Sequence, residues 1–266
     1  MPRGRQGALP LGAGAVWILI GVLLFLLYLP LFPPALFSVG LAEPGAHGVT
    51  FRAYAELWSS PILVSATVTT LEVAAIVGIA APALGLLAAL AVRELRIPRL
   101  VLLLVLLPLF VPGVSMGLAS AFFFRVLGIV PSLATVALVQ TLWALPFATL
   151  VTLTVMSTFD PILLEAAHVT GANRLRGFLD IELPIIRPGI IGAILFSLIL
   201  SFNETIRTSL VQGPLNTVQT YIWSTYKETG LSPAIYALMT LLILLTLLLL
   251  ASMLAIGSRR APRFPD

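Results

Sequence analysis

The chain has 266 residues, of which 59% are hydrophobic and only 10% are charged, and its formal net charge is +4. A soluble globular domain carries about 25% charged residues, so this composition excludes a soluble protein and indicates an integral membrane protein. The absence of cysteine excludes disulfides and thiolate metal sites. His47 and His168 lie far apart without the spacing of metal ligands, so neither a metal site nor a cofactor is expected.

Six apolar runs are long enough to cross a hydrocarbon core of about 30 Å, which takes about 20 helical residues. The first run, 11–29, follows Arg3 and Arg5 and could also be interpreted as a signal peptide. The apolar region of a signal peptide is only about 7–15 residues long, so we predict a membrane span here. The other predicted spans are 61–92, 100–124, 133–156, 189–208 and 233–256.

Prolines lie inside several of these runs, and each removes one backbone hydrogen-bond donor. The second run, 61–92, contains Pro82 and is expected to be longer than the bilayer or bent there. Pro108 and Pro112 interrupt the third run, and Pro146 lies inside the fourth. Polar loops or short turns connect the runs at 38–60, 93–99, 125–132, 157–188 and 209–232.

The basic residues predict the orientation, because cytoplasmic loops carry an excess of lysine and arginine. Six spans place both termini on one side with the 93–99 turn and the 157–188 loop. That side holds eleven basic residues, which are Arg3, Arg5, Arg93, Arg96, Arg99, Arg174, Arg176, Arg187, Arg259, Arg260 and Arg263. The opposite side holds four, which are Arg52, Arg125, Arg207 and Lys227. We therefore expect the termini and the 157–188 loop in the cytoplasm.

The longest polar stretch lies inside that loop, at 160–188. Asp160 can cap a helix that begins at Pro161, where the missing N–H costs nothing. A short helix is predicted over 162–170, and Gly171 can end it in a left-handed turn. A second short helix is predicted over 173–179, after which Leu183-Pro184 and Arg187-Pro188-Gly189 are expected to break the chain before the fifth span.

This stretch also carries a sequence pattern whose fixed positions are Glu165, Ala166, Ala167, Gly171, Ile181, Leu183 and Pro184. It resembles the EAA loop of the inner-membrane permease subunits of binding-protein-dependent ABC importers. From about 60 to 256 the order of segments is similar to the type I permease fold, with the first span added in front. The resemblance implies a single transmembrane domain over 1–266 and a cytoplasmic coupling loop at 157–188.

The seven pattern residues are therefore expected to couple the chain to an ATPase. Ala166 and Ala167 are small enough for close approach to a partner groove, and Gly171 lets the chain reverse without a Cβ clash. Glu165 either binds a basic residue of the partner or simply lies in the first turns of its helix, where the helix dipole favours an acidic side chain. Arg174 and Arg176 either pair with acids of the partner or contact lipid headgroups.

A second group of polar residues lies at membrane depth, where charged side chains usually face a cavity or another polar group. Asn203, Glu204 and Arg207 lie in the fifth predicted span, and Glu72 lies in the second. Glu204 and Arg207 are three residues apart, so they can pair on one helix face. These four residues either line the translocation path or hold the helices together. Gln140 and Trp143 are expected to serve packing and interhelical hydrogen bonding.

The family resemblance implies several partners and no catalytic residue in this chain. The partners are two ABC ATPase subunits, a second permease subunit expected to be a different chain, an external solute-binding protein and membrane lipid, with no nucleic acid. The chain contains no phosphate-binding loop of the G-x-x-x-x-G-K-[ST] type, so ATP hydrolysis is assigned to a partner. The implied location is the bacterial inner membrane.

The segments 201–214 and 221–243 are most similar to the second permease subunit of spermidine/putrescine importers. Asn203 stands where that subfamily usually has an acid, and Arg207 adds a positive charge. Ferric iron, phosphonate or another small solute therefore remains an alternative substrate. An ion-coupled transporter acting alone would leave the EAA-like loop unexplained. A membrane enzyme would need a nucleophile with its base or metal ligands at depth, and no histidine, cysteine or paired carboxylates lie in the spans.

Overall fold

The computed structural model describes residues 12–41, 48–95, 97–228 and 230–258. Every regular element in these residues is a helix, which confirms the predicted all-α class. Several residues used in the sequence argument lie outside the described residues, namely Arg3, Arg5, His47, Arg96, Arg259, Arg260 and Arg263.

The described residues form two compact units. The first contains those up to Leu57 together with Ser232–Ile243, and the second contains Trp58–Leu231 together with those from Leu244 onward. In chain order the elements are α1 (Gly12–Tyr28), η1 (Leu29–Leu31), α2 (Phe32–Ser38), α3 (Arg52–Ser59), α4 (Pro61–Glu94), α5 (Pro98–Phe110), α6 (Gly113–Val126), α7 (Leu133–Met156), α8 (Ile162–Val169), α9 (Arg174–Gly177), η2 (Phe178–Glu182), α10 (Leu183–Phe202), α11 (Ile206–Val211), α12 (Val218–Glu228) and α13 (Pro233–Ser258).

Among the described residues, five helical segments are long and apolar enough to cross a membrane: Gly14–Ser38, Pro61–Glu94, Leu133–Met156, Arg174–Phe202 and Pro233–Ala255. The predicted third span is different, because α5 and α6 meet at an angle of 103°. Val111 is extended at φ −88° and ψ 123°, as a residue before proline tends to be, and this ends α5. The bent pair is a sixth span if it is counted as one.

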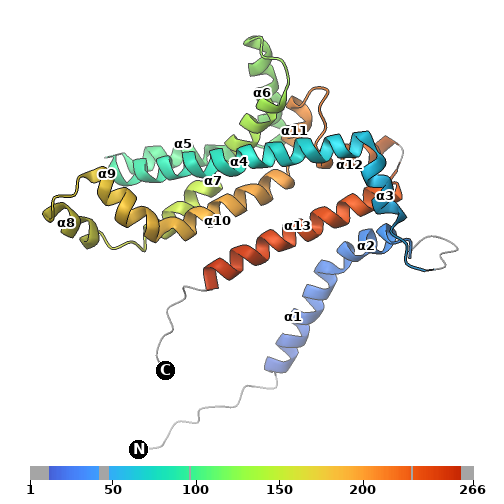
Figure 1. Ribbon diagram of the computed structural model, residues 1–266, viewed down its shortest axis with the longest axis horizontal. Helices are drawn as coiled ribbons and strands as arrows, with labels where there is room; N and C mark the ends of the chain where they lie inside the picture. Colours follow the sequence, from blue (N-terminus) through green and yellow to red (C-terminus); the bar gives the residue numbers. More distant parts are fainter. Residues whose placement is uncertain (1–11, 42–47, 96, 229, 259–266) are drawn as a thin grey trace, which may run out of the picture. The chain divides into compact units, whose positions relative to one another are not determined.

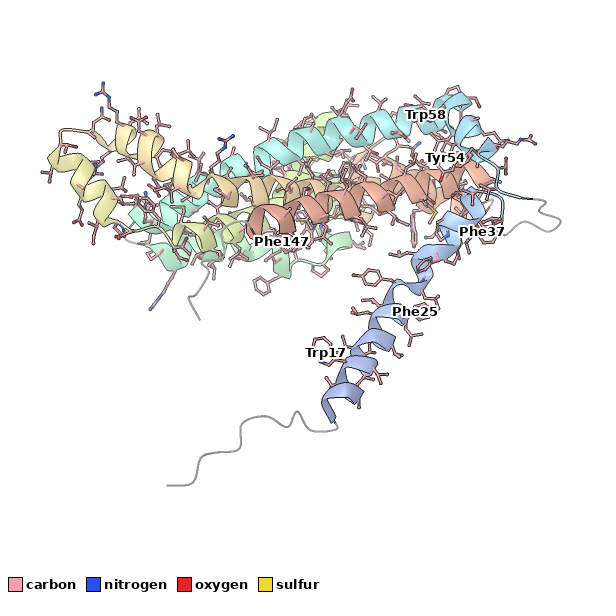
Figure 2. The ribbon with its side chains drawn as sticks, turned by 60° about the horizontal axis from the view of Figure 1, so that its bottom comes forward. Trp17, Phe25, Phe37, Tyr54, Trp58 and Phe147 are labelled. Atoms are coloured by element: carbon pink, nitrogen blue, oxygen red, sulfur yellow. The ribbon has the colours of Figure 1, made fainter. Side chains whose placement is uncertain are left out.

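The first unit begins with α1, whose side chains are apolar on every side. Residues 14–33 are all exposed (Figure 2), including Trp17 and Phe25. A helix that is hydrophobic all round is typical of a membrane span. Further along the same unit, the ring of Phe37 stacks on Tyr236 at a centroid distance of 4.8 Å.

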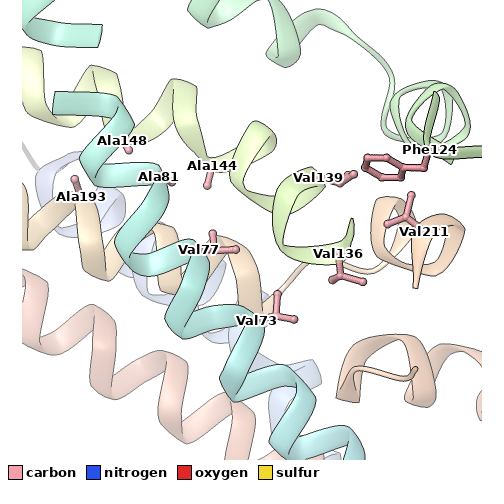
Figure 3. Close-up of a cluster of buried hydrophobic side chains, with 10 residues drawn as sticks. All are labelled: Val73, Val77, Ala81, Phe124, Val136, Val139, Ala144, Ala148, Ala193 and Val211. Carbon is pink, nitrogen blue, oxygen red and sulfur yellow. The ribbon is translucent and has the colours of Figure 1, made fainter. Parts of the chain in front are cut away.

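The core of the second unit lies mainly where α4, α7 and α10 pack against one another, with one side chain each from α6 and α11 (Figure 3). Its buried side chains are mostly alanine and valine: Val73, Val77, Ala81, Phe124, Val136, Val139, Ala144, Ala148, Ala193 and Val211. Small residues at helix contacts let backbones approach closely in a membrane. At Gly85 a Cβ atom would lie only 2.9 Å from the backbone nitrogen of Thr149, so α4 and α7 are in contact through their main chains.

Helix α4 has 34 residues, which corresponds to about 51 Å at 1.5 Å per residue. It is therefore longer than the hydrocarbon core, as predicted, and it continues through Pro82. Helices α8 and α9 lie at one end of α4, α7 and α10, while α11 and α12 lie toward the other end (Figure 1). These two ends carry the two groups of candidate functional residues.

Candidate functional site

The loop between α7 and α10 begins with the cap predicted for Asp160. The Asp160 side chain accepts a hydrogen bond from the backbone N–H of Ile162 at 3.0 Å. Helix α8 is followed by a turn at Gly171, whose φ of +93° lies in the left-handed region that favours glycine. The backbone N–H of Gly171 donates to His168 and that of Ala172 to Ala167, each at 3.0 Å. This pair of bonds forms a Schellman turn, so the first helix-turn is built as the sequence predicted.

The predicted coupling residues divide into an exposed set and a set that anchors the loop. Glu165, Ala166, Gly171 and Pro184 are exposed, Ala167 is buried, and Ile181 and Leu183 are half-buried. Ile181 packs with Leu164 and Phe178 against the apolar cluster formed by Ala89, Met156, Phe159 and Ile186. One side of the loop is therefore fixed to the helix ends, and the other side faces outward.

The predicted chain break at Leu183-Pro184 is wrong, because one helical segment continues from Arg174 to Phe202. Asn173 caps its start by accepting a hydrogen bond from the backbone N–H of Arg176 at 2.8 Å. The element η2 is a π-helix, in which the Leu183 N–H donates to the carbonyl of Phe178. Pro184 follows directly, in the first turn of α10. This wider turn accommodates the proline that was expected to end the helix.

The predicted break at Arg187-Pro188-Gly189 is also absent, because Pro188 lies inside α10. Prolines are tolerated within membrane helices, where neighbouring helices and local adjustments satisfy the freed backbone groups. Pro82, Pro108 and Pro146 lie inside α4, α5 and α7 in the same way.

An ion pair that the sequence argument did not identify joins the loop to α4. Arg93, near the end of α4, donates through Nη1 to Oε1 of Glu182, the last residue of η2. Glu182 is only 1% exposed. The two residues are 89 positions apart, so no local spacing links them. The one available signal was an acid placed between Ile181 and Leu183 of the loop pattern.

The second candidate group lies where α10 ends and α11 begins. Glu204 and Arg207 pair as predicted, with 2.7 Å between Oε2 and Nη1. The other carboxylate oxygen of Glu204 accepts the backbone N–H of Arg207 at 2.9 Å. The Arg207 guanidinium lies 3.8 Å from the ring centre of Trp143. A Cβ added to Gly113 would lie 3.3 Å from the guanidinium carbon of Arg207, so the backbone of α6 lies against another side of this guanidinium group.

A polar network continues from this pair along α7. The Gln140 side chain donates to Thr208 at 2.8 Å and accepts from Ser201 at 2.5 Å. This confirms the predicted interhelical hydrogen bonding by Gln140. The four candidate path residues are thus only partly brought together. Glu204 and Arg207 are buried against each other, whereas Asn203 is exposed and donates to its own helix at Ile199.

Glu72 is also exposed, on α4. Among the preceding threonines, Thr70 accepts a hydrogen bond from the backbone N–H of Val218 at 2.8 Å and so connects α4 to α12. An ionised carboxylate on the outside of a membrane helix is costly unless a cavity or a partner subunit faces it. Within the described ranges, no three histidine, aspartate or glutamate side chains gather in a metal-binding arrangement.

Comparison with known proteins gives relatives that are named as transport permeases. The chain is 24% identical over 198 residues to the spermidine/putrescine transport system permease protein PotC of Haemophilus influenzae, covering 74% of this chain and 77% of that protein. It is 30% identical over 205 residues to the putrescine transport system permease protein PotI of Escherichia coli strain K12, covering 74% and 73%.

Solved structures show the same fold at lower sequence identity. The chain matches a chain of a bacterial alginate ABC transporter in complex with an alginate pentasaccharide-bound periplasmic protein, with a TM-score of 0.63 and 20% identity over 95% of this chain and 96% of that one. It matches a chain of the inward-facing MetNI methionine ABC transporter with a TM-score of 0.63 and 19% identity, over 76% and 96%.

The model of one protein family, described as binding-protein-dependent transport system inner membrane component, matches residues 81–263. That range includes the α7–α10 loop, α10 and the Glu204–Arg207 pair. The match and the membrane-spanning helices identify a multi-pass inner-membrane protein of the ABC-importer type. The chain therefore belongs to the family of binding-protein-dependent transport system inner membrane components.

Proposed function

We propose that this chain forms the translocation path for a small polyamine-type solute, which an external binding protein delivers and a separate ATPase drives inward. The observation that carries the proposal is helix α8, which is capped at Asp160, closed at Gly171 and anchored on one side. Ile162, Ala166 and Val169 are exposed at helical spacing on its outer side. An apolar stripe of this kind suits the groove of a partner protein.

In this proposal the 157–188 loop lies in the cytoplasm, as do both termini, because the basic residues are more numerous on that side. Glu165, Ala166, Ala167, Gly171, Ile181, Leu183 and Pro184 form the contact with the ATPase or hold it in place. The complete importer contains two ATPase subunits, this chain, a second and different permease chain, and the binding protein. The whole chain is one transmembrane domain whose permease core is about 60–256.

The names of the curated relatives favour a polyamine as the solute. A specific observation favours a second candidate, which is another small solute such as ferric iron or a phosphonate. Both carboxylate oxygens of Glu204 are occupied by Arg207, so this acid is not free to bind an ammonium group. Glu72 and Asn203 are the exposed candidates for the path.

The test is ATP-driven uptake by the purified complex. The full chain is isolated with its ATPase and second permease subunit, reconstituted into vesicles and supplied with the binding protein and labelled putrescine or spermidine. Uptake that requires both ATP and the intact α8 supports the proposal. Full uptake without an ATPase, or with α8 replaced by a flexible linker, would refute it. Thermal protection of the binding protein by one solute over the others decides between the two substrate candidates.

A further inference from the structure

Three helices, α4, α7 and α10, make up most of the core of the second unit, but the loop is covalently joined to only two of them. It follows α7 and leads directly into α10. Helix α4 lies 63 residues before the start of the loop, counted from Glu94 to Ser157, and contacts it through the apolar side chains around Ala89 and through Arg93. Any motion of the loop therefore needs a non-covalent connection to reach α4.

The Arg93–Glu182 ion pair supplies the charged part of that connection, beside the apolar contacts of the cluster around Ala89. Arg93 uses Nη1 for Glu182 and Nε for its neighbour Glu94, the latter at 3.0 Å. The second carboxylate oxygen of Glu182, Oε2, is buried and has no hydrogen-bond partner among the described residues. Arg93 is thus the one described cation that compensates this buried acid. Removing one partner of a buried pair leaves an uncompensated charge, which is strongly unfavourable.

The surroundings of the pair give it a mechanical role. A cavity of about 580 Å³ lies between the end of α4 and the loop, lined by Leu90, Arg93, Glu94, Leu164, His168, Arg174, Leu175, Phe178 and Glu182. The loop therefore packs against α4 only in part, because Leu164 and Phe178 join the apolar cluster around Ala89 and the cavity lies beside them. Glu182 is also the last residue of the π-helix η2, a type of turn that occurs frequently at functional sites.

We infer that Arg93 and Glu182 are positioning residues that transmit movement of the α8–η2 loop to α4. Helix α4 bears Glu72 on an exposed face, 21 residues from Arg93, or about 32 Å along the helix axis. The helix is continuous between these two residues and passes through Pro82, so the pair links the loop through one helix to a candidate residue of the path. This inference rests on the proposed function, because the displacement originates in the ATPase.

The test compares Glu182→Gln and Arg93→Gln with the wild-type complex in vesicles. Each variant should lower the solute taken up per ATP hydrolysed by about 2- to 30-fold, the range expected for residues that carry coupling. Arg187→Gln is the matched control, because Arg187 is an exposed arginine on the neighbouring α10 and should leave the ratio unchanged. The exchanged double variant, Arg93→Glu with Glu182→Arg, should recover part of the ratio. If the Arg93→Gln chain does not accumulate, Arg93→Lys keeps the charge without the forked geometry and should give an intermediate ratio.

A second readout separates coupling from a purely structural role. The natural chain has no cysteine, so spin labels can be placed at exposed Leu87 on α4 and exposed Leu179 on η2. In the wild-type complex the distance between the labels should stay narrowly distributed with and without ATP. In Glu182→Gln it should broaden when ATP is added, whereas a merely stabilising pair would lower the unfolding temperature without this nucleotide dependence.

The possible failures can be told apart. Normal assembly of the Glu182→Gln complex with an unchanged uptake-to-hydrolysis ratio would overturn this inference alone. A wild-type chain that binds no ATPase would overturn the proposed function and this inference with it.

Discussion

Replacement of Gly171 by valine tests the coupling loop most directly. The backbone φ of Gly171 is +93°, and no heavy atom lies within 4 Å of the position that a Cβ would occupy. The substitution therefore creates no steric overlap with a neighbouring side chain, and its effect comes from the backbone. An L-residue in the left-handed region costs about 1–2 kcal/mol, and a β-branched residue costs more. That energy reduces the population of the Schellman turn about 5- to 30-fold.

The assay measures uptake and ATP hydrolysis in the same vesicles, together with the amount of inserted chain. We expect the Gly171→Val chain to insert normally and its complex to hydrolyse ATP. Solute uptake should fall by at least the factor by which the population of the Schellman turn falls. Gly128→Val is the matched control, because Gly128 has φ +69° and also has no atom within 4 Å of a built Cβ. Gly128 lies in the turn between α6 and α7. The Gly128→Val variant should therefore lose a similar amount of stability but keep the coupling of uptake to ATP hydrolysis. Normal uptake per ATP in Gly171→Val, or an equal loss in both variants, would refute the reasoning.

Four further substitutions test the core and the path. Gly85→Ala should lower the unfolding temperature in detergent, because overpacking against the Thr149 backbone costs about 1–3 kcal/mol. In the control, Gly192→Ala, the added Cβ has its nearest neighbour at 3.8 Å, so the higher helix propensity of alanine should raise the unfolding temperature. Equal shifts of the unfolding temperature in the two variants would disprove the close contact at Gly85. Glu204→Gln leaves buried Arg207 without its carboxylate, a loss of about 3–5 kcal/mol, and should lower the unfolding temperature as well as transport; an unchanged unfolding temperature would show that the pair contributes nothing. Glu72→Gln should leave unfolding unchanged and raise the half-saturating concentration of a cationic solute; an unaltered concentration would remove Glu72 from the path.

Local features of the fold could be predicted from the sequence because they depend on neighbouring residues. The cap at Asp160 and the left-handed turn at Gly171 each need only a few adjacent positions. The pairing of Glu204 with Arg207 follows from a spacing of three. The spans follow from the lengths of the apolar runs, although Val111 and Pro112 bend the third one by 103°.

Features that depend on the packed structure could not be predicted. The Arg93–Glu182 pair forms only when the end of α4 meets η2, and nothing in either segment alone indicates the other. The prolines at 184 and 188 were expected to end a helix, because local rules count the lost N–H but not the compensation available from a π-turn or from neighbouring helices. The break at Asn203–Thr205 was likewise missed, because the polar residues Asn203, Glu204 and Arg207 were interpreted as part of one continuous span over 189–208.

The π-helix η2 makes the number of residues between α7 and α10 as important as their chemistry. Its wider turns contain one residue more than an α-helix would need to cover the same rise. Deleting the exposed residue Asp180 from this segment would let the chain wind as a regular α-helix over nearly the same rise and rotation, because the π-turn holds one residue in excess. Helices α8 and α9 would then keep their direction about the axis of α10, and the seven-residue pattern would be intact. A deletion in the regular turns of α10 has no such residue in excess and would rotate the loop by about 100°. The loop should therefore tolerate the loss of one residue within η2 better than the loss of one residue in the adjoining α-helical turns.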